Sequence, residues 1–162
     1  MASSLDLLRR LANEKVEFVL VGGMAAVAHG SAIVTSDADV CIRFDLETLR
    51  RLFTALGGTN PRQRMHPDRP PLGDDPAQYV GFKNLCLSCD GAVLDLLGEL
   101  LAVCGYDDAV RDSVPMDLGG FECRVLGLEQ LIACKRALGR RKDLQVVEEL
   151  EWVRSHRSPG RG

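Results

Sequence analysis

The sequence predicts an α/β (α+β) fold: a mixed sheet of roughly five strands, helices packed mainly against one face, and a short helical C-terminal part. One observation is that residues 1–57 alternate between helical and strand-like patterns in the order αβαβα. Another is that two hairpin patterns follow, with helical patterns after them. A chain of 162 residues suits a single domain, which we place at residues 1–156.

The N-terminal elements follow from apolar spacing and from glycine and capping residues. A helix is expected over 5–13, because its leucines recur at helical spacing after two serines that can cap it. The apolar run 16–23 reads as a strand that stops at two glycines, and a short helix ends at Gly30. A second strand over 37–44 and a helix capped by Asp45 complete this half.

The C-terminal half opens with residues 57–78, which are rich in proline and glycine and are expected to form a long flexible loop. An Asp-Gly pair between apolar runs predicts a hairpin over 79–100, and paired glycines predict another over 113–126. Residues 128–156 read as two helices that break near Gly139. The tail 157–162 is expected to be disordered.

Composition favours a soluble, cytoplasmic protein. No apolar run approaches the roughly 20 residues of a membrane span, and the N-terminus lacks the features of a signal peptide. A net charge of −3 argues against broad electrostatic capture of nucleic acid. The six cysteines are expected to be reduced, and most to be buried. Cys86 and Cys89 form a C-x-x-C pair, which leaves a zinc or redox protein as a less favoured alternative.

Asp37 and Asp39 are the first candidates for chemistry. Side chains two apart on a strand share one face, so the two carboxylates repel each other unless a cation lies between them. Hard oxygen ligands suit Mg²⁺ or Mn²⁺. The alternative is a pair of solvent-facing turn residues. Gly22 and Gly23, upstream, close a strand and open a helix, where backbone N–H groups and the helix dipole favour a phosphate.

The glycine pair and the two aspartates together resemble the signature of a known protein family. A strand that ends in Gly22-Gly23, a short helix, and then Asp37-x-Asp39 resembles the nucleotidyltransferase superfamily with the polymerase-β-like fold. The sequence looks most like small prokaryotic members, several of which are toxins of toxin–antitoxin pairs. The family expects a third carboxylate on a later strand, and Asp95 in "VLDLLG" supplies it. By resemblance, Asp37, Asp39 and Asp95 are the catalytic residues and bind Mg²⁺ or Mn²⁺.

The resemblance extends to the C-terminal helices. Lys135 lies on an otherwise apolar helical stripe, so it either extends to the surface or reaches a negative centre such as a phosphate. We expect Lys135 and Arg140 to bind nucleotide, together with Thr35 and the two glycines of the first turn. His29 is ambiguous between a structural imidazole and a site residue. Related small members often carry an arginine in the segment that here reads "SAIV", residues 31–34.

The function implied by the resemblance is metal-dependent transfer of a nucleoside monophosphate from an NTP to a hydroxyl on RNA (tRNA included), a protein or a small molecule. A toxin role, with an antitoxin protein as partner, is part of that implication. The alternative is a catalytically degenerate domain of the same fold that binds a nucleotide or a partner. The missing arginine in 31–34 supports this alternative.

Overall fold

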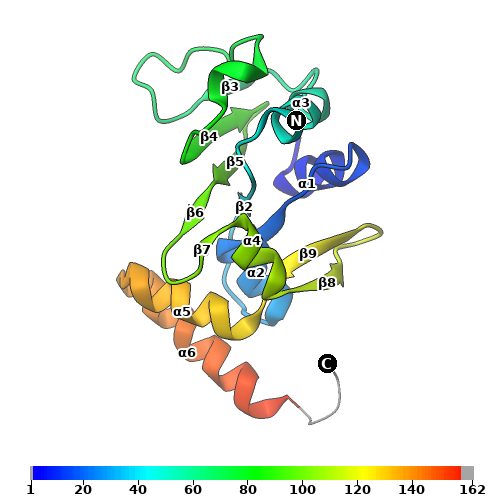
Figure 1. The fold of residues 1–162 in the computed structure, drawn as a ribbon. Coiled ribbons are helices and arrows are strands. Elements are labelled where there is room, and N and C mark those ends of the chain that lie inside the picture. Colours follow the sequence, from blue (N-terminus) through cyan, green and yellow to red (C-terminus); the bar gives the residue numbers. More distant parts are fainter. Residues whose placement is uncertain (1, 158–162) are drawn as a thin grey trace.

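The computed structural model describes residues 2–157, and Figure 1 shows their arrangement around a mixed sheet. In this part of the chain the sheet has seven strands in the order β3-β4-β5-β2-β1-β9-β8, and β6 and β7 form a separate two-stranded ribbon. The strands are β1 (Val19–Val21), β2 (Asp37–Cys41), β3 (Pro61–Gln63), β4 (Asn84–Cys89), β5 (Ala92–Leu97), β6 (Glu99–Leu100), β7 (Cys104–Gly105), β8 (Ser113–Asp117) and β9 (Glu122–Leu126).

Helices flank the sheet and form the C-terminal part. The described residues contain α1 (Ser4–Asn13), α2 (Gly22–His29), α3 (Leu46–Ala55), α4 (Tyr106–Arg111), α5 (Leu128–Leu138), α6 (Arg141–His156) and a 3₁₀ turn η1 (Pro76–Tyr79). The predicted order αβαβα over the first half is therefore confirmed. No helix among residues 2–157 is both long and apolar enough to cross a membrane.

Local capping fixes where the first helices start. Ser3 and Asp6 form a reciprocal capping box at α1, in which each side chain accepts a hydrogen bond from the other residue's backbone. At α3 the Asp45 side chain accepts a hydrogen bond from the backbone N–H of Thr48 at 2.8 Å, as its expected cap role requires. Helix α2 ends at Gly30, which adopts the left-handed conformation with φ of 116°.

The strand directions bring distant segments together. β1 pairs antiparallel with β2 and parallel with β9, whereas β2 and β5 run parallel. The two hairpins expected from sequence, β4–β5 and β8–β9, are both present. Because β2 and β5 are parallel and in register, residues of two different sequence regions lie directly side by side at the centre of the sheet.

The two faces of the sheet differ in character. On one face the central strands present Ala38, Val40, Leu94 and Leu96, all fully buried. α1 contacts β2 and β5 and also packs on α3, so these two helices cover that apolar face. On the opposite face, Asp37 and Asp39 of β2 and Asp95 of β5 are only partly buried. α1 and α3 therefore cover the apolar face, and the other face presents the polar side chains.

The C-terminal helices form a second layer beside the sheet. α5 and α6 pack on each other around Gly139, whose φ of 67° allows the break that the sequence predicted. Both helices contact α2 (Figure 1). Their apolar stripes include Leu131, Ile132 and Leu150, each no more than 1% exposed. This layer forms one wall of the cavity described below.

Three sequence expectations need correction. The sheet has seven strands in the described residues rather than roughly five. Residues 57–78 are not a continuous irregular loop, because they contain β3 and most of η1. β3 has no strand-like sequence of its own and is held by antiparallel pairing with β4. Helix α4 and the ribbon β6–β7 were not predicted. The single domain remains a prediction, and residues 158–162 of the predicted tail lie outside the described residues.

Truncation of a core leucine in α1 tests this packing. Leu8 is fully buried, whereas Leu5 on the same helix is 36% exposed. We expect Leu8→Ala to lower the free energy of unfolding by about 2–5 kcal/mol, because the sheet and helix cannot collapse fully into the cavity that the change leaves. Leu5→Ala, the matched control, should lower it by less than about 1 kcal/mol. Urea unfolding measures both, and equal losses would contradict the layer arrangement.

Candidate active site

Three aspartates meet on the polar face of the central strands. In the parallel β2–β5 pair, Asp39 is the direct register partner of Asp95, and Asp37 precedes Asp39 by two residues on the same face. All three line one cavity of about 520 Å³. The structure thus brings together the three carboxylates that the sequence and the resemblance singled out, on strands separated by more than 50 residues of chain.

Helix α2 begins directly against this cluster. Gly22, its first residue, has φ of 66°, and a Cβ added there would collide with the side chain of Asp39. Only glycine suits both the backbone conformation and this close approach. A Cβ on Gly23 would likewise press against Thr35 at 3.0 Å from its Oγ1. The first turn of α2 has no side-chain cap, which suits an anion.

The environment of Asp39 is electrostatically unfavourable for its ionised form. Burial is the largest cause that raises its pKa, and the neighbouring Asp95 is the next. Lys135 opposes the shift and Asp37 adds to it, which leaves a pKa of about 6. Burial and the neighbouring carboxylates together hold the pKa of Asp39 above the usual range of an aspartate, as is common at functional sites.

Arg64 is the cation closest to this negative charge. Its Nη2 donates to both carboxylate oxygens of Asp95, at 2.8 Å to Oδ1 and 2.7 Å to Oδ2. Its backbone N–H donates to the carbonyl oxygen of Cys86 on β4, which fixes the start of the side chain beside the sheet. Arg64 was not predicted as a site residue, because it lies in the segment expected as a loop and belongs to no periodic pattern.

The two C-x-x-C cysteines do not converge. Cys86 is the register partner of Asp95, whereas Cys89 pairs with Ala92 and is fully buried. Three residues apart on one strand, they point to opposite faces. Burial and the nearby Asp95 raise the pKa of Cys86 to about 11, so its thiol stays protonated near neutral pH. This arrangement gives no support to the zinc or redox alternative.

Lys135 and Arg140 lie on the wall of the same cavity and share one acidic partner. Lys135 is only 8% exposed, and its Nζ lies 3.3 Å from Oδ1 of Asp143. Arg140 Nε lies 2.6 Å from Oδ2 of Asp143, which is 1% exposed. Burial would raise the pKa of Asp143, but the hydrogen bonds from Arg140 and Lys135 outweigh it, so the pKa is lowered.

Asp143 was also missed, although a signal for it exists in the sequence. It precedes Val146, Val147 and Leu150 at spacings of three, four and seven residues, so it occupies the buried stripe of α6. A carboxylate on such a stripe requires a buried partner. The same argument singled out Lys135, and the two residues form that pair.

The neighbouring segment 31–34, where the resemblance expects an arginine, is anchored differently. Glu149 on α6 accepts hydrogen bonds from the Ser31 hydroxyl and the Ala32 backbone N–H, both at 2.8 Å. His29 is buried and structural, because its Nε2 lies 2.7 Å from the carbonyl oxygen of Leu126 and its Nδ1 lies 2.8 Å from an Arg157 nitrogen. Burial lowers the pKa of His29, which favours the neutral ring.

The three aspartates have the donor atoms that a hard divalent cation prefers, but their side chains are not arranged as a metal site in this structure. The donors are carboxylates, and Asp95 and Asp37 add to the burial that raises the pKa of Asp39, so a cation would stabilise the ionised form. Yet within residues 2–157 no three His, Cys, Asp or Glu side chains are posed as a metal-binding group. Asp95 accepts from Arg64 instead. The donor set therefore suits Mg²⁺ or Mn²⁺ in its chemistry, while in this structure Arg64 is the cation that contacts Asp95.

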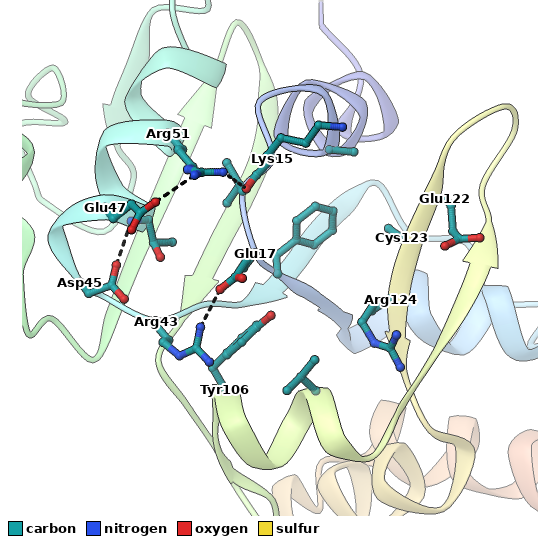
Figure 2. A pocket seen from close by; sticks show the side chains of 15 residues that line it. Lys15, Glu17, Arg43, Asp45, Glu47, Arg51, Tyr106, Glu122, Cys123 and Arg124 are labelled. Atoms are coloured by element: carbon teal, nitrogen blue, oxygen red, sulfur yellow. Dashed lines mark hydrogen bonds and ion pairs between the residues drawn. The ribbon is translucent and has the colours of Figure 1, made fainter.

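A second cavity, of about 690 Å³, lies at the other end of the central strands (Figure 2). Four of its charged side chains form two ion pairs with one another. Arg43 lies 2.6 Å from a Glu17 oxygen, and Arg51 lies 2.9 Å from a Glu47 oxygen. Tyr106 lies beside Arg43, with the guanidinium 4.4 Å from the ring centroid. We therefore place the candidate active site at the aspartate cluster and not here.

Comparison with known proteins supports the fold. No protein-family model matches the sequence, and no curated protein matches it either. Among solved structures, the chain is similar to a Thermotoga maritima protein provisionally assigned as a nucleotidyltransferase, with a TM-score of 0.55 and 18% sequence identity. The similarity covers 94% of this chain and 91% of that one. The chain therefore has a nucleotidyltransferase-like α+β fold, and its activity has to be argued from the site.

The pH dependence of stability tests the environment of Asp39. An ordinary aspartate has a pKa of 3.8, so a folded-state pKa of about 6 means that the folded chain binds the proton more tightly. The contribution of this proton to the free energy of unfolding is fully present below the pKa that Asp39 has in the unfolded chain. It is lost as the pH rises through about 6. We expect Asp39→Asn to be more stable than wild type by on the order of 2 kcal/mol near pH 8, with little difference near pH 4.

Urea unfolding in the presence of a chelator, at both pH values, measures this difference. Asp74→Asn, which alters an exposed carboxylate, is the control and should show no such pH dependence. A stabilisation by Asp39→Asn that is equal at both pH values would show that Asp39 titrates normally.

Proposed function

We propose that the protein is a metal-dependent nucleotidyltransferase that moves a nucleoside monophosphate from an NTP to a hydroxyl acceptor on RNA (tRNA included), a protein or a small molecule. The observation that carries the proposal is that Asp37, Asp39 and Asp95 share one face directly beside the glycine start of α2. Carboxylates next to a helix N-terminus combine a cation site with a phosphate site. The similar fold of the Thermotoga maritima protein supports this reading.

Each site residue has a role in this proposal. Asp37, Asp39 and Asp95 would hold Mg²⁺ or Mn²⁺, which when bound would neutralise the triphosphate and assist the in-line displacement. Asp95 would take up the proton of the acceptor hydroxyl, whose oxygen bonds to the α-phosphorus as pyrophosphate leaves. The backbone of Gly22 and Gly23 would receive the departing phosphates.

The cations on the cavity wall complete the nucleotide site. Lys135 and Arg140 line the cavity, although both contact Asp143 in the free chain. Arg140 is mostly exposed, and Lys135 remains beside Asp143 if the Arg140 guanidinium turns toward a phosphate. Thr35 lies against Gly23 and would hydrogen-bond a phosphate oxygen. We propose these three as nucleotide-binding residues together with the two glycines.

Nucleotide incorporation tests the proposal. With labelled NTPs, Mg²⁺ or Mn²⁺ and a panel of RNA, protein and small-molecule acceptors, we expect transfer by the wild-type chain. Asp37→Ala and Asp39→Ala should each reduce transfer at least about 100-fold, because each removes a ligand of the cation that acts in the transition state. Asp74→Ala is the control with an exposed carboxylate. Transfer that survives either site substitution would refute the proposed mechanism.

A second candidate is a catalytically degenerate domain that binds a nucleotide or a partner. The observation that favours it is that Arg64 already occupies both oxygens of Asp95, while segment 31–34 lacks the arginine that the resemblance expects. Calorimetric titration with an NTP distinguishes the two. Binding that depends on Mg²⁺ or Mn²⁺ supports the enzyme, and binding that is indifferent to both supports the degenerate domain.

We also propose, from the sequence resemblance alone, a toxin role with an antitoxin protein as partner. If the transfer reaction is toxic, expression of the wild-type chain should arrest growth, and Asp39→Ala should relieve the arrest at the same protein level. Growth curves with matched expression measure this. Harmless high-level expression of an active wild-type chain would argue against the toxin role and leave the transferase proposal intact.

A further inference from the structure

Arg64 and Asp95 form an ion pair inside the candidate active site. The exposed fractions of their side chains are 31% and 17%, so the pair is partly shielded from water. Both residues line the cavity that Asp37, Asp39 and Lys135 also line. Because Asp95 is one of three adjacent carboxylates, Arg64 neutralises part of the charge that a divalent cation would otherwise neutralise.

The geometry of this pair is not that of a strong structural ion pair. An arginine fork normally engages a carboxylate through two nitrogens, whereas here Nη2 alone contacts both oxygens. Arg64 Nε is buried and has no hydrogen-bond partner among the described residues. A buried donor without a partner costs free energy. The guanidinium therefore has donor capacity that Asp95 does not use.

The attachment of Arg64 allows it to change partners. The backbone N–H of Arg64 donates to the Cys86 carbonyl oxygen at 2.8 Å. Arg64 directly follows the last residue of β3, and the segment from there to Arg69 is mostly exposed. The side chain thus extends from an anchored position at the edge of the site over the carboxylates. Two nitrogens of a guanidinium can donate to the oxygens of a phosphate at the same time, whereas a contact through a single nitrogen uses only part of the donor capacity.

We propose that Arg64 is a switchable counter-cation: it holds Asp95 in the free chain, is displaced by the divalent cation, and then binds a phosphate of the NTP. This inference rests on the proposed function. Since Arg64 contacts both oxygens of Asp95, the guanidinium and the metal compete for that carboxylate. An NTP that accepts Arg64 removes the competitor, so NTP and metal bind cooperatively, each raising the affinity for the other by the same factor.

Metal binding to the nucleotide-free chain tests the competition without relying on activity. Calorimetry with Mn²⁺ is compared for wild type and Arg64→Gln. We expect Arg64→Gln to bind Mn²⁺ about tenfold more tightly, because it removes the positive charge that occupies Asp95. Arg62→Gln is the matched control: Arg62 precedes Arg64 by two residues, and among the described residues its side chain donates only to the carbonyl oxygen of Arg69. It should bind Mn²⁺ like wild type.

The second half of the test adds a non-hydrolysable NTP analogue. In wild type the analogue should tighten Mn²⁺ binding, and in Arg64→Gln this enhancement should shrink by about tenfold while the affinity for the analogue falls. Arg64→Lys, which keeps the charge without the paired donors, should retain weak Mn²⁺ binding in the free chain. Arg64→Lys is the second variant in case Arg64→Gln does not fold correctly. Circular dichroism checks the fold of each variant.

The outcomes separate the inference from the proposed function. Mn²⁺ affinity that is unchanged or weaker in folded Arg64→Gln overturns the inference, even if wild type transfers nucleotides. Tighter Mn²⁺ binding with loss of NTP enhancement supports it, even if no acceptor is found and the transferase proposal fails. Absence of Mn²⁺ binding in every variant refutes both.

Discussion

The parallel pairing of β2 with β5 is the constraint on which the site depends. It places Asp39 directly beside Asp95, with Asp37 on the same face, so three carboxylates share a small, partly buried area. Burial, and after it the repulsion from the neighbouring carboxylates, raises the pKa of Asp39 to about 6. A fold with this register needs positive charge or hydrogen-bond donors around the cluster. The features around it (Arg64 over Asp95, Lys135 near Asp39 and the uncapped start of α2) supply both.

The glycine turn follows from the same constraint. Because β1 pairs with β2, Val21 lies opposite Asp39, and the chain must turn into α2 immediately beside that carboxylate. A side chain at position 22 would occupy the space of Asp39, and the backbone there adopts a positive φ. The close approach places the N–H groups of a helix start next to the acidic cluster. The turn and the carboxylates are thus parts of one arrangement in which a phosphate and a cation can lie side by side.

Much of this could be predicted from the sequence where the information is local. Apolar periodicity and capping residues predicted α1 and α3, glycines between apolar runs predicted the two hairpins, and the glycine pair with Asp37-x-Asp39 indicated the candidate site by resemblance to a family. β3 could not be predicted, since only its pairing with β4 makes it a strand. Arg64 could not be predicted either, because only the tertiary structure brings it into contact with Asp95. Asp143 could have been found, because it lies on an apolar helical stripe as Lys135 does.

The catalytic and degenerate interpretations differ physically in how the negative charge of Asp95 is neutralised. If the Arg64 pair were permanent, it would be expected to use two nitrogens of the guanidinium and leave no donor unpaired, since an unsatisfied buried group is costly and has no compensating role. The observed pair uses one nitrogen and leaves Nε without a partner among the described residues. This geometry is better suited to a temporary partner than to a substitute for metal. It also places a guanidinium in the cavity of a chain whose 31–34 segment has none, so under the proposed function an arginine would still be available to a phosphate.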